Sequence, residues 1–366
     1  MLNKPIAVLG GGNGAQTMAA DLTLAGYTVH LYETPEFAKG PKFAPVLESK
    51  TIELKGMGRT GKAKIAKVTT DMAEALEGVE WINVVIPATG HDTFFKELLP
   101  HLRDGQAVVV WAGDYGSLRL AHLLKESGIK KNVTIAEANT LPYGTRLEEA
   151  GVVNLLCAAP LVLLASLPGK KSAQIVDVLK LAYPCLQPCR NVLVAGFCNP
   201  NPIVHPPGSL LNTGRIQYSR GDFNMYREGI TEAVARVIRH IFIEVESVAK
   251  AMGLEVLQYE DRDFRATTSI MGVAFQAPFD TAGVIASIAG PHTIYDRYIT
   301  EDLPFGLVPV SQLGDKLGVP TPVTDSIVYI GSAVCNQNFW QMGRTLKQLG
   351  IADMTPSQIV EYVDGM

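Results

Sequence analysis

The chain has 366 residues, of which 47% are hydrophobic and 19% are charged, and a formal net charge of −4. This composition is typical of a well-packed globular protein and excludes a disordered chain. The mild negative charge provides no electrostatic footprint for nucleic acid, so none is expected as a partner. Because single domains usually hold roughly 100–200 residues, we expect two domains.

The first half of the chain alternates apolar runs with amphipathic ones. Strands are expected at residues 6–9, 28–33, 81–88, 106–113 and 133–140. Helices are expected up to about residue 24 and at residues 71–78, 92–102 and 117–127. Strands that are apolar on both faces and separated by helices predict a parallel sheet covered on both sides. We therefore predict an α/β fold with a Rossmann-type, doubly wound parallel sheet.

The apolar stretch 152–167 is interrupted by Pro160. It is too short and too broken to span a bilayer, and we expect two buried strands, followed by a helix near 170–182. The N-terminus carries no signal segment, and the five cysteines show no framework spacing. Cys185 and Cys189 have no second Cys/His pair with zinc spacing, so no metal is expected. These features predict free thiols and a cytoplasmic protein with no membrane partner.

Past about residue 190 the pattern becomes helical. Residues 226–253 are expected to form one long helix, because apolar residues recur at three- and four-residue steps and Gly253 is a plausible C-cap. Residues 322–350 have the same pattern, whereas the proline- and asparagine-rich stretch 199–215 is expected to be irregular. We therefore predict a dinucleotide-binding domain at 1–190 and a mainly α-helical substrate and catalytic domain at 191–366.

The turn after the first strand, 10-GGGNGA-15, fits the pattern G-x-G-x-x-A. Gly10 permits the tight turn, Gly12 lets the backbone approach a pyrophosphate, and Ala15 lets helix and strand pack closely. The following helix presents N–H groups and a partial positive charge to the phosphates. The predicted cofactor-binding residues of this turn are Gly10, Gly12, Asn13, Gly14 and Ala15.

Glu33 lies 18 residues past Ala15, near the end of the second strand. A carboxylate there accepts hydrogen bonds from the ribose hydroxyls and repels a 2′-phosphate, so NAD(H) is favoured over NADP(H). The glycine motif does not by itself distinguish a nicotinamide from a flavin. Pro87 follows a strand at the edge where open α/β sheets bind ligands, and we include it among the cofactor residues. His91 and the segment 111–113 fall at similar positions.

A reductase needs a proton donor near the carbon that receives hydride, and histidine suits this role because its pKa lies near 7. The chain has seven histidines, and those within predicted strands or helices have structural roles as the simpler explanation. His205 and His292 stand in segments expected to be irregular, with small and polar neighbours. Residue pattern alone makes His205 a candidate and leaves a structural role open.

Several segments resemble the opine dehydrogenases, the octopine/nopaline dehydrogenase family, and in particular their bacterial members. The matching pieces are 10-GGGNGA-15, 137-EANTLPYGTR-146, 199-NPNPIVHP-206, 226-YREGIT-231 and 297-RYITEDLPFGLVP-309. They run in the family's order over nearly the whole chain. The resemblance implies a dinucleotide domain followed by a helical one, with the active site between them.

The resemblance also implies a reaction and its residues. An amino acid and a 2-keto acid, expected to be pyruvate, form an imine that receives hydride from NADH, so the enzyme acts on CH–NH bonds. His205 matches the family's catalytic histidine and Asp302 the carboxylate that orients it. Arg297 matches the arginine that binds the keto-acid carboxylate, and Asn201 matches a pocket residue. Glu137 matches an acid that in some members senses the amino-acid substrate.

Two other functions remain open. A ketopantoate-type or simple 2-keto acid reductase shares the two-domain plan but typically carries a catalytic lysine on a helix of the second domain. A non-catalytic NAD(H)-binding regulatory protein needs no histidine–aspartate pair. The amino acid, the role of Arg146 and the oligomeric state, with a homodimer as one option, are not fixed by the sequence. The candidates for side chains that line the substrate pocket are Phe223, Tyr226, Phe264, Met271 and Phe275.

Overall fold

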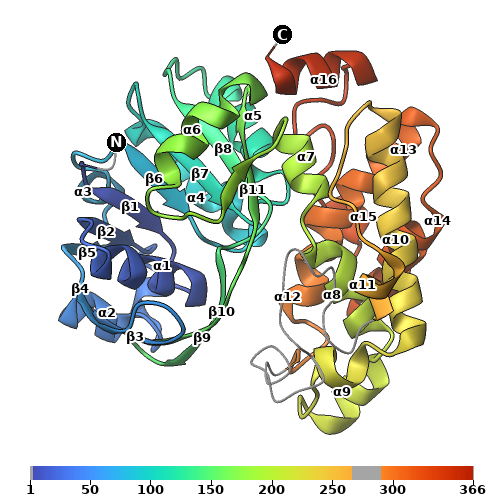
Figure 1. Ribbon diagram of the computed structural model, residues 1–366, viewed down its shortest axis with the longest axis horizontal. Coiled ribbons are helices and arrows are strands. Elements are labelled where there is room, and N and C mark those ends of the chain that lie inside the picture. Colours follow the sequence, from blue (N-terminus) through green and yellow to red (C-terminus); the bar gives the residue numbers. More distant parts are fainter. Residues whose placement is uncertain (1–2, 266–289, 366) are drawn as a thin grey trace. The chain divides into compact units, whose positions relative to one another are not determined.

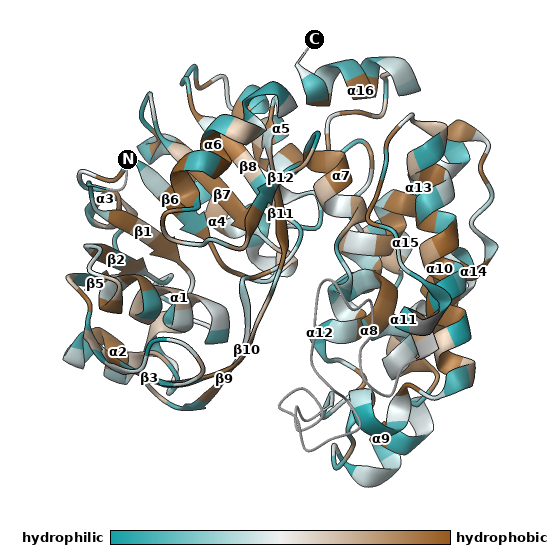
Figure 2. Ribbon diagram, in the orientation of Figure 1, coloured by the Kyte–Doolittle hydropathy of each residue, from teal (hydrophilic) through white to brown (hydrophobic). Residues whose placement is uncertain are grey.

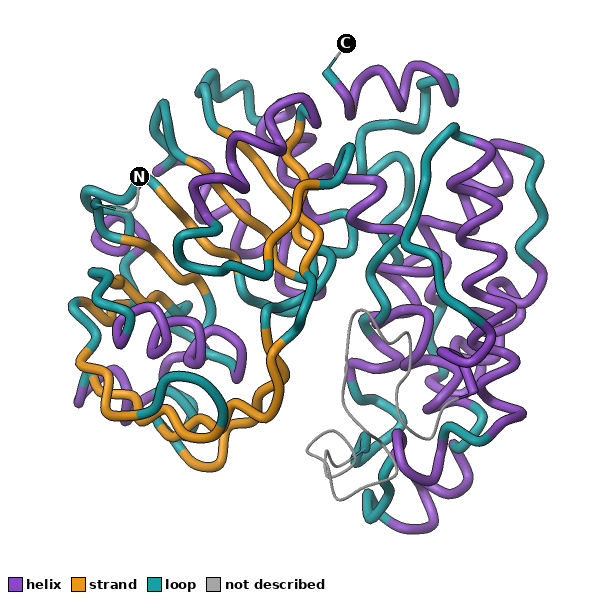
Figure 3. Tube along the Cα trace, in the orientation of Figure 1, coloured by secondary structure: helices purple, strands orange, loops and turns teal. Residues whose placement is uncertain are grey.

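The computed structural model describes residues 3–265 and 290–365, which form two compact units (Figure 1). One unit comprises Met1–Val192 and the other Leu193–Met366. The first combines strands and helices, and the second, as described, is built from helices and turns (Figure 3). The predicted fold class, a Rossmann-like sheet followed by a helical domain, is confirmed.

The main sheet of the first unit has eight strands in the order β12-β11-β8-β7-β6-β1-β2-β5. These strands are β1 (Ile6–Leu9), β2 (Val29–Tyr32), β5 (Lys67–Thr69), β6 (Trp81–Val84), β7 (Ala107–Trp111), β8 (Thr134–Ala138), β11 (Val162–Leu167) and β12 (Leu186–Pro188). All neighbouring pairs from β8 to β5 are parallel. The pair β11 and β8 is antiparallel, so the sheet is mixed at one edge, in a departure from the wholly parallel prediction.

Helices cover both faces of this sheet, as the doubly apolar strands predict. The helices are α1 (Asn13–Leu24), α2 (Ala44–Ser49), α3 (Met72–Ala75), α4 (His91–Leu98), α5 (Gly116–Glu126) and α6 (Ser172–Leu179). Ile6 and Val8 pack in one apolar core with residues of α1 and α6. Ala7 and Leu9 point the other way, into a core with residues of α3, α4 and α5. The central strands are accordingly apolar along their length (Figure 2).

A second sheet, which the sequence analysis did not predict, has the order β4-β3-β10-β9. Its strands are β3 (Thr51–Gly56), β4 (Gly61–Lys64), β9 (Tyr143–Glu149) and β10 (Val152–Ala158). The stretch 152–167 does form two strands, but β10 belongs to this sheet and β11 to the main one. Burial explains the division, because β10 is buried on alternate residues whereas β11 is buried on nearly all of them.

The second unit packs helices around α8 (Asn201–Leu210) and α10 (Glu232–Ala251). Its other elements are α7 (Val192–Phe197, which crosses the unit boundary), α9 (Thr213–Ser219), η5 (Met225–Gly229), α11 (Asp261–Arg265), α12 (Arg297–Thr300), η6 (Asp302–Leu307), α13 (Val308–Leu317), α14 (Pro322–Cys335), α15 (Phe339–Met342) and α16 (Pro356–Asp364). No helix in the described parts of the chain is long and apolar enough to cross a membrane.

The expectation of an irregular segment around His205 is wrong, because residues 201–210 form helix α8. Pro202 stands in the first turn, where a missing N–H costs nothing. Pro206 and Pro207 each remove a helical hydrogen bond, yet all residues of α8 after Asn201 are buried. Packing against α10, α12, α14 and η6 therefore outweighs the two lost bonds.

The helix predicted at 226–253 begins later than expected. The side chain of Thr231 accepts a hydrogen bond from the N–H of Val234 and so starts α10 at Glu232. Residues Met225–Gly229 form the separate π-helical turn η5. The apolar stripe is present, and Gly253 follows the helix with a left-handed φ of 67°.

Candidate active site

The glycine turn lies between β1 and α1, in the strand–turn–helix context that the motif requires. Gly10 has a φ of 124°, and a Cβ there would lie 2.5 Å from the carbonyl oxygen of Val85. Glycine is therefore needed at this position by the fold itself. Ala15, in the first turn of α1, is fully buried in the core that this helix shares with β1, so the small third residue serves close helix–sheet packing.

Gly12 differs from Gly10 because its surroundings are open. It is exposed, and a Cβ added there would meet nothing within 4 Å. Gly12 is also the N-cap of α1 and provides no side-chain cap to the helix. The first N–H groups of a helix have no partner within the helix, so this end of α1 suits an anion that approaches the main chain.

The next residues of the turn, Asn13 and Gly14, contact other residues of the first unit. The side-chain oxygen of Asn13 accepts a hydrogen bond from the N–H of Leu147 in β9, at 3.3 Å. Gly14 packs beside Leu141, and a Cβ on it would lie 2.9 Å from that side chain. Pro87 is exposed just after β6, at the N-cap of the short turn η2 (Ala88–Gly90).

Glu33 directly follows β2, beside the glycine turn. Its side chain accepts a hydrogen bond from the N–H of Thr34 at 2.7 Å, and a Cβ on Gly11 would lie 2.8 Å from its carboxylate. Glu33 is 8% exposed, and this burial raises the pKa of its carboxyl group. Hydrogen bonds from Thr34 and Gly11 oppose that rise. The acid thus lies where the sequence motif predicts it.

In the second unit, α8 and η6 bring together the predicted histidine and aspartate. Nδ1 of His205 lies 2.7 Å from Oδ2 of Asp302, although 97 residues separate them in sequence. Both are buried, with exposed fractions of 6% and 3%. Burial raises the pKa of the Asp302 carboxyl group, the neighbouring Glu301 raises it further, and Arg297 opposes both. The two groups therefore lie at hydrogen-bond distance in a buried setting.

Two tyrosines also contact the imidazole. The hydroxyl of Tyr226 lies 2.9 Å from Nε2 of His205, and the ring of Tyr298 stacks on the imidazole with centroids 3.9 Å apart. From the sequence, Tyr226 is only a pocket candidate, and Tyr298 is not predicted. Both stand inside the motif pieces 226–231 and 297–309, and this was the available signal.

Both polar partners of His205 stand on π-helical turns. Tyr226 belongs to η5 (Met225–Gly229), and Asp302 is the first residue of η6 (Asp302–Leu307). Turns of this type are rare and occur often at functional sites. Their presence on two sides of one imidazole sets this part of the helical unit apart from its regular helices.

Arg297 opens α12, one residue before the stacked tyrosine. Its guanidinium lies 5.7 Å from the ring centroid of Tyr298 and 3.5 Å from the carboxylate of Glu301. The side chain is 52% exposed, so it presents a charge to solvent beside the buried pair. Asn201 lies one helical turn before His205 at the start of α8, where its N–H donates to the side-chain oxygen of Asn199.

Glu137 lies in β8 and is 1% exposed. Its carboxylate accepts hydrogen bonds from the N–H groups of Tyr115 and Ser117, at 2.7 and 2.9 Å, and from the Ser117 hydroxyl. Tyr115 belongs to the turn after β7, in which Ala112, Asp114 and Tyr115 all have positive φ, and Ser117 stands in the first turn of α5. The carboxylate thus binds the main chain of a strained turn, and an amino-acid ligand would have to share it.

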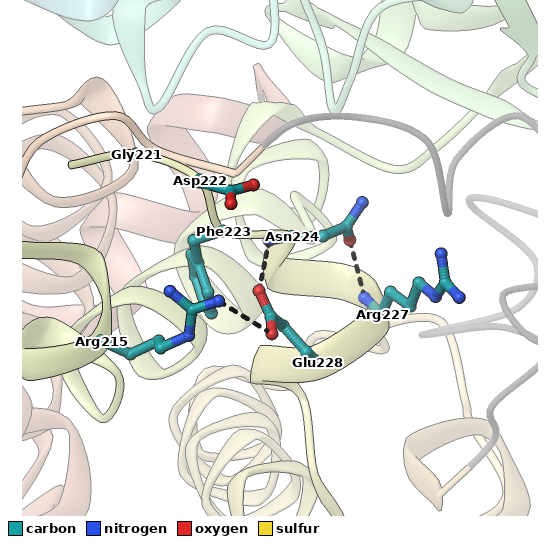
Figure 4. A pocket seen from close by; sticks show the side chains of 7 residues that line it. All are labelled: Arg215, Gly221, Asp222, Phe223, Asn224, Arg227 and Glu228. Carbon is teal, nitrogen blue, oxygen red and sulfur yellow. Dashed lines mark hydrogen bonds and ion pairs between the residues drawn. The ribbon is translucent and has the colours of Figure 1, made fainter. Parts of the chain in front are cut away.

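A cavity of about 560 Å³ in the second unit is lined by Arg215, Gly221, Asp222, Phe223, Asn224, Arg227 and Glu228 (Figure 4). Among the pocket candidates, Phe223 lines this cavity, Phe264 is buried, and Met271 and Phe275 lie outside the described residues. Within residues 3–265 and 290–365, no group of acidic, histidine and cysteine residues could hold a metal ion.

Comparison with known proteins shows which proteins this chain resembles. Residues 188–335 match the family model of the NAD/NADP octopine/nopaline dehydrogenase α-helical domain. The chain is 29% identical over 366 residues to the opine dehydrogenase of Arthrobacter sp. (strain 1C), with 99% of both chains covered. The helical part of the chain is thus similar to the octopine/nopaline dehydrogenase family, and the whole chain aligns with an opine dehydrogenase.

Solved structures share the fold of this chain. An octopine dehydrogenase solved with NADH and pyruvate superposes with a TM-score of 0.73, at 18% identity, over 99% of this chain and 98% of the other. A ketopantoate reductase of the PanE/ApbA family from Ralstonia eutropha JMP134 superposes with a TM-score of 0.62, at 16% identity, over 91% and 98% of the chains. The fold is thus shared with both reductase types, whereas the region matched by the octopine/nopaline dehydrogenase family model contains His205, Arg297 and Asp302.

Proposed function

We propose that this protein is an NAD(H)-dependent opine dehydrogenase that joins an amino acid to a 2-keto acid, pyruvate being the expected partner. The amine adds to the keto carbon, water leaves, and the resulting imine is reduced to a secondary amine. The buried contact between His205 and Asp302 is the observation that carries this proposal. The similarity of the chain to opine dehydrogenases and to the octopine/nopaline dehydrogenase family model supports it.

His205 is the proposed general acid and base. Asp302 fixes the ring through Nδ1 and stabilises its charged form, which leaves Nε2 to exchange a proton with the oxygen that departs from the keto carbon. Catalysis of this kind contributes about 10²–10⁴-fold to the rate. The stacked ring of Tyr298 holds the imidazole plane and keeps water from one face.

Arg297 is proposed to bind the carboxylate of the keto acid. A guanidinium presents paired N–H donors that match a carboxylate, and this one is exposed beside the buried pair. Asn201, at the start of the same helix as His205, is proposed as a second substrate contact. A substrate role for Glu137 stays a prediction, because its carboxylate already serves the turn after β7.

NAD(H) is the proposed cofactor and supplies the hydride when bound. The residues of the first unit fit it, since Gly12 leaves open space, α1 offers its uncapped N-terminus and Glu33 stands beside the turn. Glu33 is proposed to accept hydrogen bonds from the ribose hydroxyls and to disfavour NADPH through charge repulsion.

The deciding experiment is NADH oxidation with pyruvate, measured with and without a mixture of amino acids. The proposal expects turnover only when both substrates are present, and a product whose mass equals both substrates minus water plus two hydrogens. Turnover with the keto acid alone would instead establish a simple keto acid reductase. NADH binding without any turnover would establish a regulatory protein.

A further inference from the structure

We propose that the hydroxyl of Tyr226 relays the proton between His205 and the substrate. This inference rests on the proposed function and adds a second proton-transferring group to it. The structure identifies that group by its place on the imidazole nitrogen that would otherwise face the substrate.

Both nitrogens of the imidazole have partners in the described structure. Nδ1 contacts Asp302 and Nε2 contacts Tyr226, while Tyr298 lies against a ring face. His205 is only 6% exposed, whereas Tyr226 is partly exposed. A substrate oxygen that exchanges a proton with Nε2 must therefore either displace the Tyr226 hydroxyl or reach the imidazole through it.

The turn that carries Tyr226 is held at both ends, which favours transfer through the hydroxyl over displacement. The side chain of Asn224 accepts a hydrogen bond from the N–H of Arg227, and its own N–H donates to the carboxylate of Glu228 (Figure 4). Glu228 also lies 3.5 Å from Arg215 of α9. The carbonyl oxygen of Gly229 accepts a hydrogen bond from Asn212.

Helix α8 holds the same turn from beneath. A Cβ on Gly208 would lie 2.8 Å from the sulfur of Met225, so the turn packs directly on the backbone of the helix that carries His205. Tyr226 and His205 are therefore fixed on two elements in close contact. Their hydroxyl–nitrogen distance of 2.9 Å is a property of this packing and needs no rearrangement for proton transfer.

The proposed step balances without any redox change at the protein. As the carbon–oxygen bond of the amine adduct breaks, the nitrogen lone pair forms the C=N bond of the protonated imine. The electron pair of the broken bond leaves with the hydroxyl oxygen, which takes the proton of the Tyr226 hydroxyl and departs as water. The Tyr226 oxygen takes the proton from Nε2 of the protonated His205. The imidazole becomes neutral and keeps its hydrogen bond to Asp302.

Tyr226→Phe tests the relay, because it removes the hydroxyl and keeps the ring. The relay predicts a kcat at least about 10²-fold lower, with NADH affinity and Tm unchanged. In mixtures of H2O and D2O, a plot of the wild-type kcat against the deuterium fraction should be curved, because two protons move together in the relay. The matched control is Tyr218→Phe on α9, where the tyrosine is 89% exposed and wild-type kinetics are expected.

The outcomes separate this inference from the function on which it rests. If His205→Ala abolishes turnover while Tyr226→Phe keeps the wild-type kcat, the relay is overturned and the opine dehydrogenase assignment stands. If His205→Ala also keeps full activity, the assignment of the catalytic pair fails. Should Tyr226→Phe fold poorly, 3-fluorotyrosine at position 226 should move the basic limb of the kcat profile to lower pH. An unmoved limb would overturn the relay.

Discussion

The glycine turn of the first unit and the imidazole cluster of the second represent two ways to build a ligand site. The turn offers main-chain N–H groups and empty space at Gly12, and its side chains serve mainly to hold it. The cluster consists of side chains from separate elements, with the main chain buried beneath them. A site built from main-chain groups is sensitive to added side-chain volume where the ligand approaches. A site built from side chains depends on the individual functional groups.

This difference predicts that variants of the two regions have separable effects. Changes of volume in the turn should affect NADH binding and leave the chemistry of the cluster intact. Changes of functional group in the cluster should affect turnover and leave NADH binding intact. Four expected outcomes test the separation, in decreasing order of size.

The largest effect is expected for His205→Ala and Asp302→Asn. Loss of general acid and base catalysis should lower kcat by about 10²–10⁴-fold, while NADH affinity stays within about twofold. Stopped-flow kinetics and fluorescence titration with NADH measure the two quantities. A large loss of NADH affinity in either variant would break the separation between the regions.

Gly12→Ala should weaken NADH binding roughly 10- to 100-fold and leave Tm unchanged. The added methyl group meets no protein atom, but it fills the space proposed for the pyrophosphate. Gly10→Ala is the counterpart, because its φ of 124° and the nearby Val85 carbonyl should cost about 1–3 kcal/mol of stability. Calorimetry gives the Tm of both variants and titration gives their NADH affinity. Equal losses of stability and of affinity in the two variants would contradict the separate roles of Gly12 and Gly10.

Glu137→Gln should lower stability by about 1–3 kcal/mol, since an amide nitrogen would face main-chain N–H donors that the carboxylate now satisfies. The expected fall in Tm is roughly 2–8 °C. Chemical denaturation and the KM for the amino acid should be measured together. An unchanged stability with a much higher KM would favour the substrate role over the structural one.

Glu33→Gln should produce the smallest change in stability. Burial raises the pKa of this carboxyl group above its value in the unfolded chain, so its contribution to stability is present at low pH and is lost as the pH rises through the folded-state pKa. The variant should therefore gain up to about 2 °C in Tm relative to the wild type at pH 7, but not at pH 4. Its preference for NADH over NADPH should also fall, and an unaltered preference would argue against the ribose contact.

The ease of prediction from sequence follows the same division between the regions. The glycine turn is contiguous and directly follows an apolar strand, so pattern and context suffice to locate it. The partnership of His205 and Asp302 spans 97 residues and has no local signal, so only family resemblance pointed to it. The stacking of Tyr298 on His205 is a tertiary contact, which the residues next to Tyr298 in sequence do not predict.

Two errors in the fold have identifiable causes. The segment around His205 carries prolines that normally end helices, but burial of nearly every residue of α8 favours the helix. The strand at 152–158 was not assigned to its own sheet, although its alternating burial implies one covered face. Both outcomes depended on neighbours distant in sequence, which local propensity does not contain.

The wide turns η5 and η6 imply an unusual sensitivity to chain length near the imidazole. A π-helical turn contains an extra residue relative to an α-helical one, and each residue of an α-helix advances the side-chain direction by about 100°. Removing a single residue from either turn could therefore restore a regular helix and still rotate Tyr226 or Asp302 away from the ring. One-residue deletions here should be far more harmful to turnover than most substitutions, even where the protein remains folded.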